Sequence, residues 1–335
     1  MSEYFFDRAK ITEEIKHLIR TNNFEKIYNC IFFAKVIMIY FFIYFVFYCN
    51  YWMYNKYGVR ALYLLPVFIV MIGCLQYIIA QASHEAIHFH IKYKNTFYSI
   101  LCTFLILYPI GVTKNYKNSH ALHHIHFGDK ERDPDYLTFM TPPCSKMKFW
   151  LMLVKSFLGI STAKRVLNLF RYRRKSVNQR DTTIMKQAVE LFKLMSVQGI
   201  LFLILMKMGI GWSYFVLWIL PLALITKSLI DIRLLAEHSP MENTEPALRS
   251  FMKKDWSNSL LGVFGFKFHA EHHLYPGIPY YNLHKVSPII KKHAMCMRGS
   301  EHDYKIELSE LSYFHFLKKY YHSLPGKFEK RISND

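Results

Sequence analysis

The sequence predicts an all-α integral-membrane protein, in which four transmembrane helices form two hairpins and polar helices form a cap on one side of the membrane. Three observations predict this fold. Long apolar stretches occur in two pairs, 52% of the residues are hydrophobic while the formal net charge is +19, and the histidines gather in three groups. Basic residues beside apolar spans are typical of the cytoplasmic side of a membrane protein. We therefore expect the basic residues to interact with membrane lipids and not with nucleic acid.

The first pair of apolar stretches covers residues 31–49 and 61–82. The first stretch has one lysine in nineteen positions, and the second has no charged residue. At about 1.5 Å per residue, each can cross a hydrocarbon core of about 30 Å. Residues 50–60 are the predicted link, so 31–82 is the first hairpin, and residues 1–30 form an amphipathic lead-in.

The second pair covers residues 194–206 and 212–230, and Pro221 is expected to kink its second member. Between the pairs, residues 97–113 are apolar but reach only about 25 Å, which is marginal for a span. If the three histidine groups share one site, they lie on one face of the membrane. We therefore expect the 97–113 segment to leave and re-enter on the same side without crossing.

The whole chain, 1–335, is predicted to be one domain. It divides into the lead-in (1–30), the first hairpin (31–82), a segment with two histidine groups and a basic cap (84–190), the second hairpin (194–230) and a C-terminal cap with the third group (231–335). Both termini and the basic run 171–175 fall on the side of the histidines, which the positive-inside rule makes cytoplasmic. The six cysteines form no C-x-x-C pair, which argues against a disulfide framework or a cysteine zinc site.

Three histidine boxes have the spacing of metal ligands on helices. Side chains at positions i, i+3 and i+4 share one helical face, so each box offers two or three imidazoles to one volume. With one isolated histidine added, the set exceeds the three or four ligands of a single zinc ion and predicts a two-metal site. Imidazole suits iron, zinc and copper alike, so these residues do not choose the metal. The candidate ligands are His84 and His88 (first box), His120, His123 and His124 (second box), His269, His272 and His273 (third box), and the isolated His238.

Other polar residues beside the boxes are candidates for a supporting role. Ligating imidazoles usually donate their second N–H to a carboxylate or carbonyl, and acids also cap helices. His90 and His126 lie off the shared faces, so we expect them to support the site and not to bind metal. The neighbouring acids are Glu85, Asp129, Asp133, Asp135, Asp231, Glu237 and Glu271; among them Glu85, Asp231, Glu237 and Glu271 are the chief candidates. No catalytic residue separate from the ligands is predicted.

Four segments together resemble the membrane fatty acid desaturase family. They are HEAIH at 84–88, SHALHH at 119–124 followed by Asp133-Pro134-Asp135, Ala236-Glu237-His238, and HAEHHLYPGIPYYNLHKV at 269–286. The resemblance spans roughly residues 84–286, and their order and spacing match as a set. One departure is Phe268, where many relatives carry asparagine.

The resemblance implies a helical fold with four membrane helices beneath a cytosolic cap, and two iron ions held by the three boxes and His238. It further implies an acyl-lipid desaturase that uses dioxygen to remove two hydrogens from an acyl chain. No His-Pro-Gly-Gly haem motif occurs, so no fused haem domain is expected, and a separate ferredoxin or cytochrome would supply electrons. Some relatives hydroxylate or ketolate lipids and carotenoids on the same scaffold, and the histidines alone do not separate these outcomes.

Two other classes of protein fit parts of the pattern. His84-Glu85-x-x-His88 matches the H-E-x-x-H motif of zinc metallopeptidases, with Glu85 as general base, but that assignment leaves both H-x-x-H-H groups unexplained. A metal transporter would place its ligands near the middle of the bilayer, whereas these boxes lie at the ends of spans and in polar sequence. The sequence therefore favours the oxygen-dependent enzyme.

Overall fold

The computed structural model describes residues 13–15, 25–92, 96–113, 115–164, 181–240, 245–293 and 305–325. These residues are mostly helical and fall into two compact units. We call Phe24–Ser119 with Ser156–Ile230 the membrane unit, and Met1–Asn23, His120–Lys155 and Asp231–Asp335 the sheet unit. The basic run 171–175 and most of the predicted lead-in lie outside the described residues.

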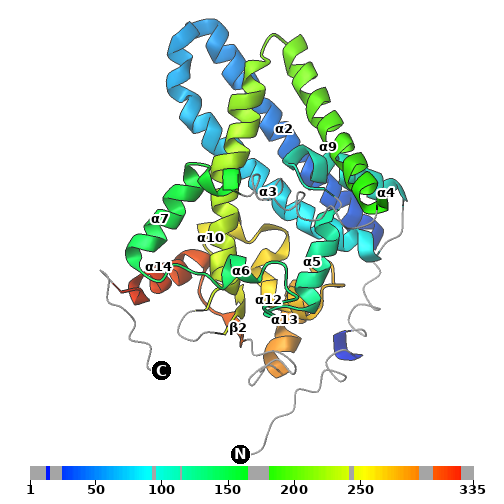
Figure 1. The fold of residues 1–335 in the computed structure, drawn as a ribbon, viewed down its shortest axis with the longest axis vertical. Helices are drawn as coiled ribbons and strands as arrows, with labels where there is room; N and C mark the ends of the chain where they lie inside the picture. Colours follow the sequence, from blue (N-terminus) through cyan, green and yellow to red (C-terminus); the bar gives the residue numbers. More distant parts are fainter. Residues whose placement is uncertain are drawn as a thin grey trace, which may run out of the picture. The chain divides into compact units, whose positions relative to one another are not determined.

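A helical hairpin opens the membrane unit (Figure 1). Its helices are α2 (Glu25–Tyr57) and α3 (Leu65–Lys92), joined by the short 3₁₀ helix η1 (Gly58–Leu64). Gly58 has a φ of +58°, which a residue without a Cβ adopts at little cost and which ends α2. Pro66 lies in the first turn of α3, where its missing N–H is harmless. Helix α3 continues past the predicted span and carries the first histidine box.

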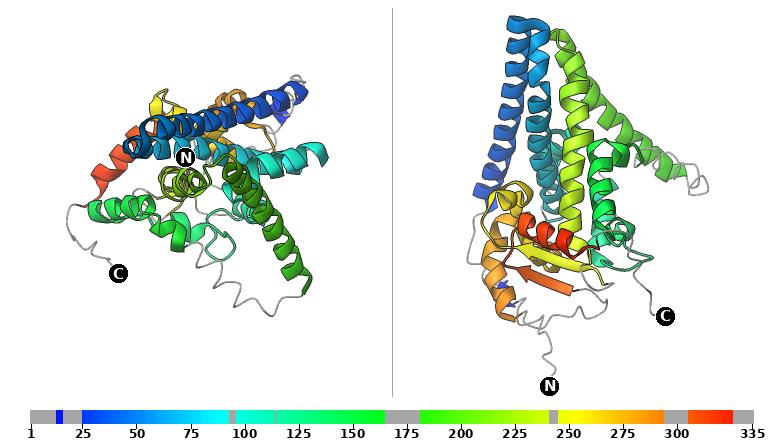
Figure 2. Two further views of the ribbon diagram at one scale, coloured as in Figure 1. Left: turned by 90° about the horizontal axis from the view of Figure 1, so that it is seen from above. Right: turned by 90° about the vertical axis from the view of Figure 1, so that its left-hand side faces the viewer.

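The second apolar pair forms α9 (Asp181–Lys207) and a helix with two π-helical stretches, η4 (Tyr214–Ile219) and η5 (Leu222–Thr226). Pro221 lies between these two stretches. The loss of a backbone hydrogen bond at proline is thus accommodated by wider, π-helical turns instead of one sharp kink. Within the membrane unit, α2, α3 and the 214–230 helix run alongside one another (Figure 2).

Helix α3 and the η5 stretch approach each other closely at Gly73. A Cβ added at Gly73 would lie 2.4 Å from the Cβ of Ile225, so only glycine fits there. Side chains join the same two helices: the Thr226 hydroxyl donates to the Gly73 carbonyl at 2.9 Å, and Gln76 Nε2 donates to the Trp218 carbonyl at 2.8 Å. In a lipid environment such bonds satisfy polar groups that water cannot reach.

The short apolar segment forms a chain of small helices. They are α4 (Thr96–Leu101), the π-helix η2 (Cys102–Leu107) and the 3₁₀ helix η3 (Tyr108–Ile110). Gln198 of α9 fastens the end of this segment, because its Nε2 donates to the carbonyls of Tyr108 at 2.7 Å and Pro109 at 2.9 Å. The expectation that this segment does not cross the membrane stays a prediction.

Three helical stretches among the described residues are long and apolar enough to cross a membrane. They are Asn29–His88, which contains α2, η1 and α3, then Ala188–Lys207 and Tyr214–His238. Large apolar side chains on them are exposed, among them Phe41 at 63% and Phe192 at 73%. Such surfaces are stable against lipid and unfavourable in water, which confirms the expectation of apolar, membrane-type helices.

The sheet unit contains two parallel strands that were not predicted from the sequence. Strand β1 (Ala247–Phe251) pairs with β2 (Lys305–Ser309) in the register Ala247↔Lys305 to Phe251↔Ser309. All five residues of β1 are buried, so β1 lacks the apolar–polar alternation that marks a half-exposed strand, and the alternation in β2 covers only five residues. The prediction of a purely helical chain was therefore wrong at this point.

Helices surround these strands in the sheet unit. Apolar side chains of Phe127, Phe139, Leu248 and Ala270 form one buried cluster, which packs the histidine-bearing helices against β1. The helices are α5 (Asn115–Ile125), whose residues from His120 onward belong to this unit, α6 (Tyr136–Phe139), α7 (Lys146–Phe157), α10 (Lys227–His238), α11 (Trp256–Leu261), η6 (Val263–Phe268), α12 (His269–Leu274), α13 (Tyr280–His293) and α14 (Tyr313–Ser323).

Candidate metal centre

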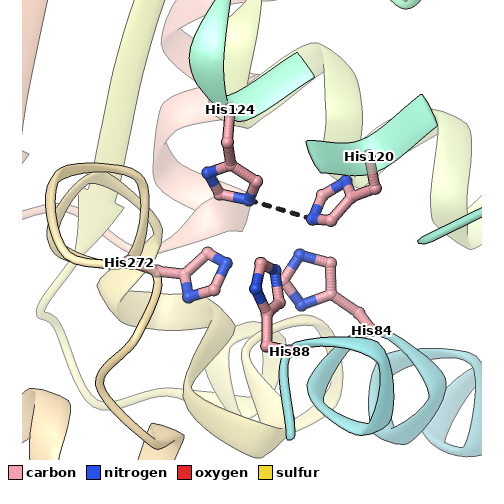
Figure 3. Close-up of side chains that lie close together, drawn as sticks. All are labelled: His84, His88, His120, His124 and His272. Atoms are coloured by element: carbon pink, nitrogen blue, oxygen red, sulfur yellow. Dashed lines mark hydrogen bonds between the residues drawn. The ribbon is translucent and has the colours of Figure 1, made fainter. Parts of the chain in front are cut away.

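Imidazoles of the second and third boxes converge within the sheet unit. His120 and His124 project from α5 and His272 from α12, and their rings face one another (Figure 3). The Nε2 atoms of His120 and His124 lie 2.9 Å apart, and the ligand atoms of all three histidines lie within 4.8 Å of one another. This is the spacing of ligands that share one ion.

A second group of imidazoles lies beside the first. The ligand atoms of His123, His238 and His273 lie within 4.8 Å of one another, and all three side chains are buried. His269 joins this group, because its Nε2 lies 2.9 Å from Nε2 of His238. His238, which has no neighbouring histidine in the sequence, is therefore brought to the boxes at the C-terminal end of α10.

The first box lies on α3 in the membrane unit. His84 and His88 project from the same side of the helix (Figure 3), and their ring centroids are 4.9 Å apart. His84 is buried and His88 is half-buried. The i, i+4 spacing thus places both imidazoles on one face, as helical geometry predicts.

His273 shows that this arrangement fits a metal ion. Its side chain is buried, and neither ring nitrogen has a hydrogen-bond partner among the described residues. Burial without a partner is costly for a polar group, and a metal ion would remove that cost. Burial, and then the neighbouring imidazoles, hold the pKa of His273 and of His269 well below the usual value. Both rings are therefore neutral at pH 7, which is the form that binds metal.

Asp133 orients one of the second-box imidazoles. Its Oδ1 lies 2.9 Å from Nδ1 of His123 and also accepts the Asp135 amide at 2.9 Å, while Oδ2 accepts the Gly128 amide at 3.1 Å. A carboxylate at Nδ1 fixes the proton on that nitrogen and leaves Nε2 free for a metal. Asp133 is thus the acid that supports a candidate ligand most directly.

Strand β1 holds the third box through a serine. The Ser250 hydroxyl donates to Glu271 Oε2 and accepts the Ala270 amide at 2.9 Å. Burial raises the pKa of the Glu271 carboxyl. Glu271 therefore positions α12 by its bond to β1.

Arg249, the neighbouring residue of β1, holds the C-terminal end of α10. Its Nη1 donates to the carbonyls of Ala236 at 3.2 Å and Ser239 at 2.5 Å, and its Nε donates to Glu307 Oε2 at 2.6 Å. Cationic side chains stabilise helix C-termini, where carbonyls lack partners in the helix. Arg249 thereby fixes the backbone around His238.

Several supporting residues could not be found from the sequence, and several predicted ones remain predictions. Arg249, Ser250 and Tyr313 lie outside the histidine boxes, and no motif marks them. Among the predicted set, Glu85 is buried in α3, Asp231 and His126 are half-buried, and the side chain of His90 lies outside the described residues. Glu237 contacts Tyr313 and is described below.

Comparison with known proteins decides the family to which this geometry belongs. Residues 60–299 match the family described as fatty acid desaturase. The chain belongs to this family. The match covers all nine candidate histidines, and membership implies an oxidoreductase. It also favours a desaturase-type centre over the metallopeptidase and transporter alternatives.

One curated relative is named for a desaturase reaction. The chain is similar to dihydrorhizobitoxine desaturase of Bradyrhizobium elkanii, with 28% identity over 247 residues, which is 68% of each chain. This fatty acid desaturase family member therefore shares most of its length with a protein named as a desaturase.

Proposed function

We propose that the protein is a membrane-bound acyl-lipid desaturase, which introduces a double bond with dioxygen and two external electrons at a di-iron centre. The observation that carries the proposal is the presence of two adjacent groups of imidazoles in the sheet unit, in a chain of the desaturase family. Two neighbouring groups of at least three ligands each suit two ions better than one.

The proposal assigns nine histidines to two ions. Within the sheet unit, His120, His124 and His272 hold one iron. His123, His238, His269 and His273 hold the other. His84 and His88, which share one face of α3 in the membrane unit, are the remaining two proposed ligands.

The protein's own part in the reaction is positioning. Bound iron supplies the dioxygen chemistry that removes hydrogen from an unactivated CH₂ group, which acid–base side chains cannot do. The chain holds His269 and His273 neutral through burial, fixes the tautomer of His123 through Asp133, and surrounds the second group with Phe127 and Phe139. Apolar rings at this distance keep water from the reacting centre.

The proposed topology has four spans, with the histidine boxes and both termini on the cytoplasmic side. It rests on the hairpin α2–η1–α3, the two further apolar stretches and the excess of basic residues. A separate ferredoxin or cytochrome supplies the electrons, and membrane lipids supply the acyl substrate.

Two measurements test the proposal. Expression in a host of known lipid content, followed by mass spectrometry of lipids, is expected to show new double bonds. The purified protein is expected to hold two irons per chain, and His273→Ala is expected to abolish both double-bond formation and full iron loading. The control His322→Ala changes an exposed histidine of α14 outside the predicted set and is expected to retain both.

Three outcomes would contradict it. Oxygen gained without a new double bond would assign the protein as a hydroxylase or ketolase on this scaffold. One zinc per chain would favour a peptidase. Conversion of added dihydrorhizobitoxine without any change in the lipids would assign the chain the substrate for which its relative is named.

A further inference from the structure

Glu237 is a buried carboxylate beside the second group of imidazoles. It precedes His238 at the end of α10, and its side chain is fully buried. The Tyr313 hydroxyl of α14 donates to Oε1 at 2.6 Å and also contacts the Phe266 carbonyl at 3.1 Å. Oε2 has no hydrogen-bond partner among the described residues. One oxygen is therefore fixed, and the other is directed into the site without a hydrogen bond.

The side from which Glu237 approaches His269 distinguishes a ligand from a supporting acid. A supporting carboxylate contacts the ring nitrogen that faces away from the metal, as Asp133 does at Nδ1 of His123. Glu237 Oε2 instead lies 3.6 Å from Nε2 of His269, the same nitrogen that lies 2.9 Å from Nε2 of His238. The carboxylate thus approaches on the side where a metal would bind.

The distances also fit one ion. The ligand atoms of Glu237, His238 and His269 lie within 4.8 Å of one another, and all three residues are buried. Ligands that each lie about 2.1 Å from a common ion are separated by roughly 3–4 Å, depending on the angle between the bonds. The separations of 2.9 Å and 3.6 Å require little movement to reach that geometry.

Charge compensation by Arg233 is the alternative explanation for this carboxylate. Arg233 Nε lies 3.7 Å from Glu237 Oε2, which is longer than a hydrogen bond. The guanidinium carbon lies 3.8 Å from the centroid of the Phe266 ring. Arg233 therefore makes a buried anion tolerable and leaves the lone pairs of Oε2 available.

We propose that Glu237 is a direct metal ligand through Oε2, at the ion held by His238 and His269, with Tyr313 fixing its other oxygen. This inference rests on the proposed di-iron centre and deepens it. One ion then has an anionic oxygen ligand in addition to imidazoles, while the other has imidazoles alone. The two irons are chemically distinct, although the boxes that supply their histidines are alike.

Metal binding by variants of the full-length protein tests the inference. Purified wild type, Glu237→Gln and Glu237→Asp would be compared for iron per chain and for the rate at which a chelator removes it. We expect Glu237→Gln to release one of its two irons at least about tenfold faster, since even supporting residues change metal affinity by 10–100-fold. Glu237→Asp keeps the carboxylate and is expected to restore part of the retention.

The matched control is Glu190→Gln in α9. Glu190 also accepts a tyrosine hydroxyl, from Tyr108 at 2.9 Å, but it belongs to the membrane unit and no predicted ligand contacts it in a hydrogen bond among those described. We expect wild-type iron content and release in this variant. Thermal unfolding of each variant would show whether lost iron reflects a lost fold.

Infrared spectroscopy of the wild type keeps the inference testable if Glu237→Gln does not fold. In protein labelled with ¹³C-glutamate, iron loading is expected to shift a glutamate carboxylate stretch. No glutamate shift, or equal iron release from Glu237→Gln and wild type, would overturn the inference and leave the proposed function standing. A wild type that binds no metal would instead overturn the proposed function itself.

Discussion

Two imidazoles of the second group, His123 and His273, differ in how their ring nitrogens are held. His123 has its Nδ1 fixed by Asp133, whereas His273 has no hydrogen-bond partner on either nitrogen among the described residues. An imidazole whose Nδ1 is hydrogen-bonded is oriented before a metal binds. An imidazole without a hydrogen-bond partner would be oriented by the metal itself. Residues that orient ligands are therefore expected to affect metal affinity more than the fold.

Replacement of Asp133 tests this expectation. Asp133→Asn removes the negative charge that fixes the His123 tautomer, so we expect iron affinity to fall about 10–100-fold. The measurement is competition with a chelator of known affinity. Asp135→Asn is the control, because the Asp135 side chain makes no capping hydrogen bond among the described residues. Equal affinity in the two variants would contradict the role given to Asp133.

Asp255 provides a test of pH dependence. It caps α11, where its Oδ1 accepts the Asn258 amide at 3.0 Å and the Ser257 hydroxyl at 2.7 Å. Burial raises its pKa, but hydrogen bonds from Ser312, Ser257 and the Asn258 amide outweigh burial and hold the pKa at about 2, below the usual 3.8. A carboxyl with a depressed pKa stabilises the fold above pH 3.8, and this contribution is lost as the pH falls from 3.8 towards 2.

Asp255→Ala is therefore expected to lower the unfolding temperature at neutral pH, by the loss of about 1 kcal/mol of capping energy. The difference from wild type should narrow as the pH is lowered below 3.8. Thermal unfolding in detergent at pH 7 and at pH 3 measures it. A difference that stays constant or widens at low pH would contradict the assigned pKa.

At the scale of elements, the contact between α3 and η5 depends on one missing side chain. Gly73 lets α3 approach the helix that leads to His238, and Thr226 and Gln76 bond across the contact. The same α3 carries His84 and His88 about three and about four turns later. Close packing of this kind uses small residues, since lipid supplies no hydrophobic force between helices.

Gly73→Ala is expected to destabilise the protein by about 1–3 kcal/mol, the usual cost of overpacking. The added Cβ would lie 2.4 Å from Cβ of Ile225, which cannot move without its backbone. Gly199→Ala is the control, because a Cβ at Gly199 in α9 meets no described atom within 4 Å. Relative to wild type, the unfolding temperature should be lower for Gly73→Ala and unchanged or higher for Gly199→Ala. An unfolding temperature that is lower for Gly199→Ala than for Gly73→Ala would contradict close packing between α3 and η5.

Local helical geometry made the shared faces of the boxes predictable. The spacing of His84 and His88, or of His120 and His124, fixes their common direction whenever the segment is helical. The hydrophobic spans were predictable for the same reason, since length and apolar character are local properties. Helix ends were less predictable: α2 begins at Glu25 and ends at Tyr57, beyond both limits of the apolar run.

Contacts between distant parts of the chain were not predictable. Strand β2 pairs with β1 across a separation of more than fifty residues, and Tyr313 reaches Glu237 over 76 positions. Strand β1 has no periodic pattern, because it is buried on both faces, and the alternation in β2 is only five residues long. Arg249 and Ser250 looked like ordinary polar residues in the sequence and are buried only because β1 lies between the histidine-bearing helices.

At the scale of the whole molecule, the proposed topology makes a prediction about sidedness. In a variant without the six native cysteines, a single cysteine would replace Val59 in η1 or Lys319 in α14, both exposed. Four spans with a cytoplasmic cap predict that a membrane-impermeant thiol reagent labels Val59→Cys in intact cells. The same reagent should label Lys319→Cys only after the cell membrane is permeabilised. Labelling of both positions from outside would contradict the topology.

The bond from Tyr313 to Glu237 has a consequence for the order in which the protein is made. The last histidine box ends at His273, so a nascent chain carries every candidate ligand well before β2 and α14 have left the ribosome. Until then Arg249 lacks Glu307, and Glu237 lacks the hydroxyl that holds it. The apolar helices can enter the bilayer during translation, whereas Arg249 and Glu237 gain these partners only once β2 and α14 have been made. On the proposed function, we expect a ribosome-arrested chain that ends before residue 300 to contain all nine histidines and yet not retain iron.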